Sequence, residues 1–210
     1  MNLNNTLASV MLLGLIIGGN AHSQAQSTNV RIAFNGFGGT APIYLGQDAG
    51  IFKKHNLNLE MIFIPGGSLS LQALIGKSLD LLLTGGPPVV NAYLQGAKTK
   101  IIGGATNLLP YMFVATGEIR NPEQLRGKKI GISRFGSNTD YVVRLALNQF
   151  ALSANEVQII QIGGSQARLV AMKSGAIEAT VLSPEESVVA QKWDTRSCLT
   201  SSRRASSFPT

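Results

Sequence analysis

Short apolar runs alternate with amphipathic segments along most of the chain. Residues 30–34 alternate in the manner of a half-buried strand, and residues 79–83 form the apolar run of a buried parallel strand. Turns rich in Gly, Ser and Pro follow these runs and suit helix starts. The alternation predicts an α/β fold with a parallel sheet and right-handed crossovers. The expected strands are residues 30–34, 57–64, 79–83, 100–105, 111–116, 128–133, 157–162 and 179–182, with helices beginning near residues 42, 68, 87, 139, 165 and 184.

Part of the sequence is repeated at a spacing of 98 residues. Identical residues recur at that spacing through predicted strand, loop and helix alike, which argues against chance matching in Gly- and Ile-rich sequence. Two similar segments of domain size predict two similar α/β lobes, with a ligand cleft between them. The identical pairs are Ile32/Ile130, Phe37/Phe135, Gly38/Gly136, Phe52/Phe150, Ile62/Ile160, Ile64/Ile162 and Gly66/Gly164.

The repeat and the composition divide the chain into four parts. Residues 1–25 hold an apolar run from Leu7 to Ile17 followed by small and polar residues, which is typical of a secretory signal peptide. A buried N-terminal helix is the alternative, and no Lys or Arg precedes the run. Residues 28–117 are expected to form the first lobe and residues 118–193 the second.

Residues 194–210 depart from the pattern of the body. They hold five Ser, three Thr and three Arg and show neither helical nor strand periodicity. The repeat requires a counterpart of residues 100–105 there, and none is found. We therefore expect a tail without regular structure, which leaves the first lobe incomplete; a naturally disordered C-terminus is the alternative.

Composition excludes several classes of function. The chain has 210 residues, 44% hydrophobic and 14% charged, with a net charge of +7. Lys and Arg occur singly or in pairs rather than as a patch with interleaved aromatic residues, so we expect no nucleic-acid partner. The one cysteine, Cys198, lies in the tail, and His55 stands without a partner pattern. We expect no disulfide, no metal, no cofactor and no Ser/His/Asp triad.

Candidate binding residues lie in loops that follow predicted strands and precede helices. In open α/β sheets this edge binds ligands, and each loop offers free N–H groups at the positive end of a helix. Such loops suit anions; each one alone is more often an ordinary helix cap, but six of them on one edge of two facing lobes favour a site. Arg134 is the expected charge partner. The candidates are Gly39, Thr40, Ser68, Thr84 and Gly85 from the first lobe, and Ser137, Asn138, Thr139 and Ser183 from the second.

A glycine pattern also matches the dinucleotide fingerprint G-x-G-x-x-A, at Gly36, Gly38 and Ala41. The fingerprint needs an acidic residue at the end of the next strand to hold the ribose. That strand ends in Ile-Pro-Gly, and Glu60 lies in its middle. The pattern therefore does not favour a nicotinamide enzyme.

Four segments carry a resemblance to a known family: residues 39–45, 48–60, 72–80 and 125–131. They resemble periplasmic substrate-binding proteins of the nitrate/sulfonate/taurine type (SsuA-like), which share a fold with NMT1/THI5-like pyrimidine-precursor proteins. The resemblance covers about residues 30–193. It implies a type II periplasmic-binding-protein-like fold, and a non-enzymatic, periplasmic component that binds a small anion such as a sulfonate or nitrate. It also implies partners, the permease and ATPase subunits of an ABC importer, through which alone the protein meets the membrane.

Two departures from the family and two alternatives accompany this resemblance. Family members continue past this point and return to complete the first lobe, so the chain looks C-terminally truncated and is expected to fold and bind poorly. The biosynthetic branch carries a cysteine-rich motif that is missing here. A pyrimidine-precursor enzyme on the same scaffold and the ligand-sensing half of a regulator are the alternatives; product formation with cofactors would reveal the first, and a DNA-binding segment the second.

Export is expected to remove the first 23 to 25 residues, because small-x-small sites follow the apolar run at Ala21-His22-Ser23 and Ser23-Gln24-Ala25. Mass spectrometry of protein recovered from the periplasm would show a mature chain beginning at residue 24 to 26. A folded, mature protein that retains Met1 would contradict this prediction.

Overall fold

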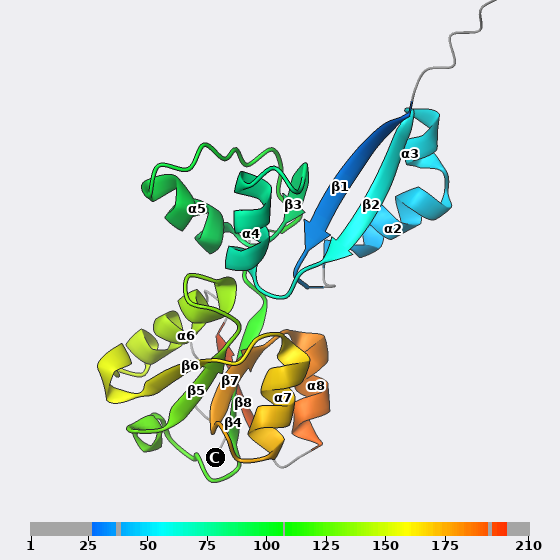
Figure 1. Cartoon of the computed structure of the whole chain (residues 1–210). Coiled ribbons are helices and arrows are strands. Elements are labelled where there is room, and N and C mark those ends of the chain that lie inside the picture. Colours follow the sequence, from blue (N-terminus) through cyan, green and yellow to red (C-terminus); the bar gives the residue numbers. More distant parts are fainter. Residues whose placement is uncertain (1–26, 37–38, 107, 193–194, 201–210) are drawn as a thin grey trace, which may run out of the picture.

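The computed structural model of the chain describes residues 27–36, 39–106, 108–192 and 195–200. The expected signal peptide, residues 1–25, and Gly38 of the glycine pattern lie outside these residues, so both stay predictions. The described chain forms two α/β lobes, one built on a three-stranded sheet and one on a five-stranded sheet (Figure 1). The expected fold class is confirmed.

The first lobe is built on a parallel sheet in the order β2-β1-β3. Its strands are β1 (Thr28–Phe34), β2 (Leu57–Phe63) and β3 (Leu81–Leu83). Pro42 stands in the first turn of α2, and Gly50, in a left-handed conformation with φ of 68°, separates α2 from α3. The helices are α2 (Ala41–Asp48), α3 (Ile51–Lys54), α4 (Gly67–Ile75) and α5 (Gly86–Leu94).

The second lobe is built on a mixed sheet in the order β6-β5-β7-β4-β8. β6, β5 and β7 run parallel, whereas β4 pairs antiparallel with both β7 and β8. The elements are β4 (Tyr111–Thr116), η2 (Pro122–Leu125), β5 (Lys129–Ile132), α6 (Asn138–Gln149), η3 (Ala154–Glu156), β6 (Gln158–Gln161), α7 (Ser165–Lys173), β7 (Ala179–Leu182), α8 (Pro184–Gln191) and β8 (Thr195–Thr200).

The sequence repeat is a structural repeat. The order β2-β1-β3 of the first lobe matches β6-β5-β7 of the second, with helices at equivalent places. Even hydrogen bonds recur at the spacing of 98 residues. The Asp80 carboxylate accepts from the Arg31 backbone N–H at 2.8 Å, and the Glu178 carboxylate accepts from the Lys129 backbone N–H at 2.9 Å. The prediction of two similar lobes is confirmed.

The structure differs from the sequence prediction in three places. Residues 100–105 form no strand, because no described strand pairs with them; Ile101 and Ile102 are largely exposed. Residues 111–116 are a strand, but β4 pairs with β7, so the change of lobe lies before Tyr111 rather than after residue 117. Thr195–Thr200, expected to lack regular structure, form β8 along the free edge of β4. Deleting Thr195–Thr200 would therefore uncover that edge of β4.

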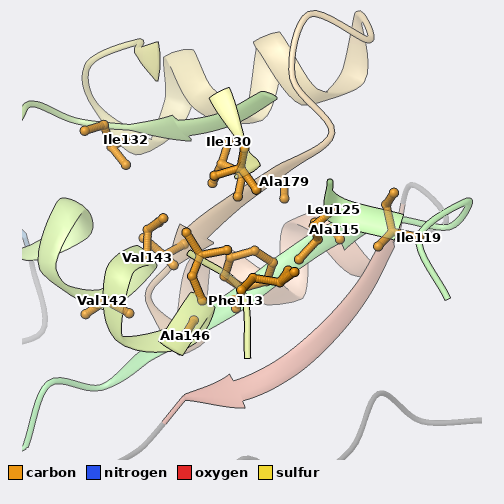
Figure 2. Packing of buried hydrophobic residues seen from close by; sticks show 14 residues of the cluster. Phe113, Ala115, Ile119, Leu125, Ile130, Ile132, Val142, Val143, Ala146 and Ala179 are labelled. Atoms are coloured by element: carbon orange, nitrogen blue, oxygen red, sulfur yellow. The ribbon is translucent and has the colours of Figure 1, made fainter. Parts of the chain in front are cut away.

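The larger core lies in the second lobe, between the sheet and α6 (Figure 2). Phe113, which is fully buried in β4, packs edge-on against Phe150 at a ring-centroid distance of 5.6 Å. Ile130 of β5 and Val143 of α6 are equally inaccessible to solvent. A second cluster on the other face of the sheet packs α7 and α8 against it, through Val114, Leu169, Met172, Ile177, Leu182 and Ala190.

The first lobe buries fewer of its apolar side chains. Ile32, Ala33, Phe34, Leu71 and Leu79 are its buried hydrophobic residues. Other large apolar side chains of this lobe remain accessible along α2, α5 and the segment that follows α5: Tyr44, Leu45, Val90, Tyr93, Leu94, Ile101, Ile102 and Leu108. The prediction that this lobe is incomplete agrees with these exposed side chains and stays a prediction.

Replacing Phe113 by Ala is expected to lower the free energy of unfolding by about 3–5 kcal/mol, because it opens a cavity in the larger core. Phe135→Ala is the matched control: Phe135 is 50% exposed, and its loss should cost no more than about 0.5 kcal/mol. Urea unfolding followed by circular dichroism measures both. Equal losses for the two variants would show that Phe113 does not hold the core.

Candidate ligand-binding site

The two lobes meet at the carboxyl ends of their parallel strands, where the sequence predicted the site. Three glycines show how closely the backbone of one lobe approaches side chains of the other. A methyl group on Gly66 would lie 3.4 Å from Ser133 Oγ, and one on Gly164 would lie 3.5 Å from Pro65 Cβ. A methyl group on Gly85 would lie 2.5 Å from Asn138 Oδ1. Real side chains do not tolerate the last distance, so Gly85 allows α5 to approach α6.

In the first lobe, a polar network holds the loops in place. Asn35, which directly follows β1, donates from Nδ2 to Thr84 Oγ1 at 2.8 Å and to Ser70 Oγ at 3.3 Å. Ser70 Oγ donates to the Gly66 carbonyl at 3.1 Å. A methyl group on Gly67 would lie 2.7 Å from Thr84 Oγ1. The network therefore joins the start of α4 to the start of α5. Sequence reasoning missed Asn35 and Ser70, although Asn35 stands at the end of a predicted strand.

Gly39 and Thr40 lie at the same edge of the first lobe. A methyl group on Gly39 would be 3.6 Å from a Leu83 side-chain carbon at the end of β3. Thr40 is 3% exposed at the start of α2. These two predicted residues are thus close to the end of β3, on the side of the sheet edge that carries α2.

In the second lobe, three hydroxyl groups satisfy one another. The oxygens of Ser133, Ser137 and Thr139 lie 2.8–2.9 Å apart in all three pairs. The backbone N–H of Ser133 also donates to Thr139 Oγ1 at 2.8 Å. All three residues are buried. The cluster fixes the loop before α6, and it includes Ser133, which sequence reasoning missed.

The helix N-termini at this edge fall into two electrostatic classes. α6 and α8 are capped by their own acidic side chains: Asp140 accepts from the Gly136 N–H at 2.8 Å, and Glu186 accepts from the Ser183 N–H at 3.0 Å. By contrast, α2 starts after Thr40 with no side-chain cap hydrogen bond and no acidic residue in the first turn. The same holds for the three helices whose starts lie nearest the contact between the lobes, α4, α5 and α7, which begin after Gly66, Gly85 and Gly164. The positive ends of these three helices are therefore not neutralised by their own first turns.

Two buried polar atoms near these N-termini have no hydrogen-bond partner among the described residues: Ser68 Oγ in the first turn of α4, and Asn138 Oδ1 beside Gly85. Asn138 is 5% exposed. Burial raises the pKa of the Tyr111 hydroxyl, and a hydrogen bond with the Asn138 side chain opposes that shift. Buried unpaired polar atoms are rare in proteins, and at a functional edge they mark places where a ligand can supply the missing partner.

Two arginines approach this edge. Arg134, the predicted charge partner, is exposed, and its Cδ lies 3.9 Å from a methyl position on Gly66. It thus stands at the rim where the lobes meet. Arg168 in α7 is 4% exposed and was missed by sequence reasoning. Its place within an apolar helix face, beside Leu169 and Met172, was the available signal.

One further surface feature lies away from the edge where the lobes meet. A hollow of about 290 Å³, lined by Val89, Val90, Tyr93, Thr99 and Ile101, lies on the flank of α5. Within the described residues, no group of three His, Cys, Asp or Glu side chains is placed to hold a metal ion. Among those same residues, no helix has the length and apolar character needed to cross a membrane.

The contact between Gly85 and Asn138 can be tested directly. Gly85→Ala is expected to lower the free energy of unfolding by about 1–3 kcal/mol, because the added methyl group would overlap a buried side chain. Gly86→Ala is the control, since nothing lies within 4 Å of its methyl position. Chemical denaturation measures the free energy of unfolding of both variants. A Gly85→Ala protein as stable as Gly86→Ala would mean that the lobes do not touch there.

Comparison with known proteins gives concordant matches. A sequence model of the family described as NMT1/THI5 like matches residues 39–199, which extends into the tail. A protein of Brucella abortus (strain 2308), provisionally named a binding protein, is 27% identical over 142 residues, which are 67% of this chain and 44% of that protein. A protein of Haemophilus influenzae, provisionally named for thiamine biosynthesis, is 22% identical over 143 residues, or 67% and 45% of the two chains. The chain thus spans less than half the length of these relatives.

Solved structures show the same fold. The alkanesulfonate-binding protein SsuA from Xanthomonas axonopodis pv. citri, bound to MOPS, superposes with a TM-score of 0.66 at 20% identity, over 85% of this chain and 62% of that one. The periplasmic aliphatic sulphonate binding protein SsuA from Escherichia coli gives a TM-score of 0.57 at 20% identity, over 80% and 56%. These likenesses show a periplasmic-binding-protein fold. Because the family model covers most of the sequence, the chain belongs to the NMT1/THI5-like family.

Proposed function

We propose that this chain is the ligand-binding part of an ABC import system and that it holds a small organic anion of the sulfonate type between its lobes. One observation carries the proposal. Three helix N-termini without acidic first-turn residues, those of α4, α5 and α7, come together at the edge where the lobes meet. Backbone N–H groups at helix N-termini bind anions without needing a lysine.

The ligand would be shared by both lobes. From the first lobe, the start of α4 offers N–H groups and Ser68 Oγ, which is buried without a described partner. Of the first three residues of α5, only Gly86 offers an N–H, because Pro87 and Pro88 have none. From the second lobe, Arg134 offers an exposed guanidinium to the anionic group, and the unpaired Asn138 Oδ1, an acceptor, can meet only a donor on the organic part of the ligand. Contacts to both lobes stabilise the closed arrangement relative to an open one, because only the closed arrangement presents both sets. Binding would thus draw the lobes together.

The remaining predicted residues have supporting places in this proposal. Ser137, Thr139 and Ser183 are engaged in hydroxyl clusters or helix caps, so they shape the loops rather than meet the ligand. Thr84 is held by Asn35 beside Gly85. Gly39 and Thr40 line the side of the edge near α2. The contacting set is therefore narrower than the sequence suggested.

A sulfonate suits three converging N-termini because it carries three equivalent acceptor oxygens on one anionic centre. The SsuA structures with the same fold are named for binding sulfonates, and one of them holds the sulfonate buffer MOPS. By the same analogy, we place the protein in the periplasm, with permease and ATPase subunits as its partners. Nitrate, an inorganic anion, and taurine, a zwitterion that carries a sulfonate group, are the other ligands to be compared.

The second candidate function is a step in the biosynthesis of a pyrimidine precursor. The observation in its favour is the Haemophilus influenzae relative, which is provisionally named for thiamine biosynthesis. Such an enzyme would release a new product when incubated with its substrates. A binding protein would return its ligand unchanged, as chromatography of the incubated mixture would show.

Isothermal calorimetry with ethanesulfonate, taurine, nitrate and a pyrimidine tests the proposal. We expect a sulfonate to bind, and Arg134→Ala to weaken that binding by about 1.5 kcal/mol, the lower end of the range for hydrogen bonds to charged groups, because the side chain is exposed. Arg126→Ala is the control, since Arg126 already pairs with Glu123 and Glu156 on the surface. Binding of the pyrimidine alone would favour the biosynthetic function.

A further inference from the structure

Arg168 is a buried cation in the second lobe. It lies in α7, 4% exposed, and its side chain crosses the face of the sheet. Nε donates to the Gly163 carbonyl at 3.2 Å, and Nη1 donates to Thr180 Oγ1 at 3.1 Å and to the Val181 carbonyl. Thr180 in turn donates to the Gly131 carbonyl at 2.7 Å. The guanidinium is therefore fixed beneath the ends of β5, β6 and β7.

The partners of this guanidinium are all uncharged. The ion pairs among the described residues join Arg31, Arg126, Lys128 and Arg144 to carboxylates, and Arg168 is in none of them. Glu186 is the acidic residue that acts on it electrostatically, and that carboxylate caps α8 through the Ser183 N–H. Burial lowers the pKa of Arg168. Arginine nevertheless keeps its proton in proteins.

A buried charge without a carboxylate partner lowers the stability of the fold, so the place where the protein keeps one can indicate a function. Gly163, which accepts from Arg168, directly precedes Gly164, the residue that begins α7. Gly164 lies against Pro65 of the other lobe. The guanidinium thus stands behind the start of α7, at the edge where the lobes meet. The guanidinium and the N-terminal end of the α7 dipole are both positive. Both therefore favour an anion bound at the start of α7.

We propose that Arg168 is the fixed positive charge that makes this site select anions over uncharged molecules of the same shape. The inference rests on the proposed function and deepens it. Arg168 acts as a positioning and electrostatic residue: its bonds go to the protein, and the ligand meets the N–H groups of α7 in front of it. Arg134, at the rim, supplies a contact that solvent screens; the charge of Arg168 is buried and is screened much less.

The test compares ethanesulfonate with ethanesulfonamide, a probe of similar shape that is uncharged at neutral pH, by calorimetry on the full chain. We expect the unmodified chain to prefer the sulfonate by at least about tenfold. Arg168→Gln removes the charge and keeps a donor, so the preference for the sulfonate should fall several-fold, and Arg134 and the helix N-termini should supply the preference that is left. A merely structural role would weaken both probes alike and leave their ratio unchanged.

A second pair of variants avoids dependence on Arg168→Gln folding. Thr180→Asp places a carboxylate beside the intact guanidinium, and Thr180→Asn places an uncharged group of nearly the same shape there. The preference for the sulfonate should fall several-fold in Thr180→Asp and be kept in Thr180→Asn. An unchanged preference in Arg168→Gln or Thr180→Asp that still binds the sulfonamide would overturn the inference alone. An unmodified chain that binds no anion would overturn the proposed function and this inference with it.

Discussion

Each lobe depends on a central parallel strand, β1 or β5, that is hydrogen-bonded on both sides. A carboxylate fixes the third strand against it: Asp80 bonds the backbone of Arg31, and Glu178 bonds the backbone of Lys129. The Arg31 guanidinium also lowers the pKa of Asp80 through a side-chain hydrogen bond. With the register of three parallel strands set, their carboxyl ends must lie along one edge. Every loop considered for binding follows from that geometry.

The edge can bind a ligand because its helices begin in two different ways. Where a helix begins with Ser183 and Glu186, its own side chains satisfy the N–H groups. Where the N-cap residue is Gly85, no side chain caps the first turn, and the Asn138 side chain of the other lobe can come close. Glycine therefore serves two needs at once, access for a ligand and close approach of the lobes. The hydroxyl cluster around Ser133 supplies rigidity on the opposite side.

Much of this fold could be predicted from the sequence, because the strands and helices have clear periodicity and the repeat sets their order. The predictions that failed concern which segments pair with one another. Residues 100–105 have the apolar content of a strand, yet no described strand pairs with them. β4 was recognised, but the sheet to which it belongs depends on its antiparallel pairing with β7. The hydrophobic pattern of a segment does not show which strand it will pair with.

The candidate site shows the same division. The loops were predicted from strand ends. The acidic capping of α6 and α8 was not predicted, although the spacing of Ser137 to Asp140 and of Ser183 to Glu186 indicates it. The close approach of Gly85 to Asn138 joins residues distant in sequence and needed the structure. So did the burial of Arg168, because an arginine in an amphipathic helix is usually solvated.

The larger core has a consequence for how the protein folds. Its residues come from one continuous stretch of chain, from Phe113 to Val181. Loops within that stretch are short, so closing them costs little entropy, and the core can nucleate without waiting for distant segments. The three-stranded lobe, with fewer buried apolar residues, has less to hold it shut against local opening. Backbone amides of β5 and β7 should therefore exchange with solvent more slowly than those of β2, and the second lobe should act as the template on which the first becomes ordered.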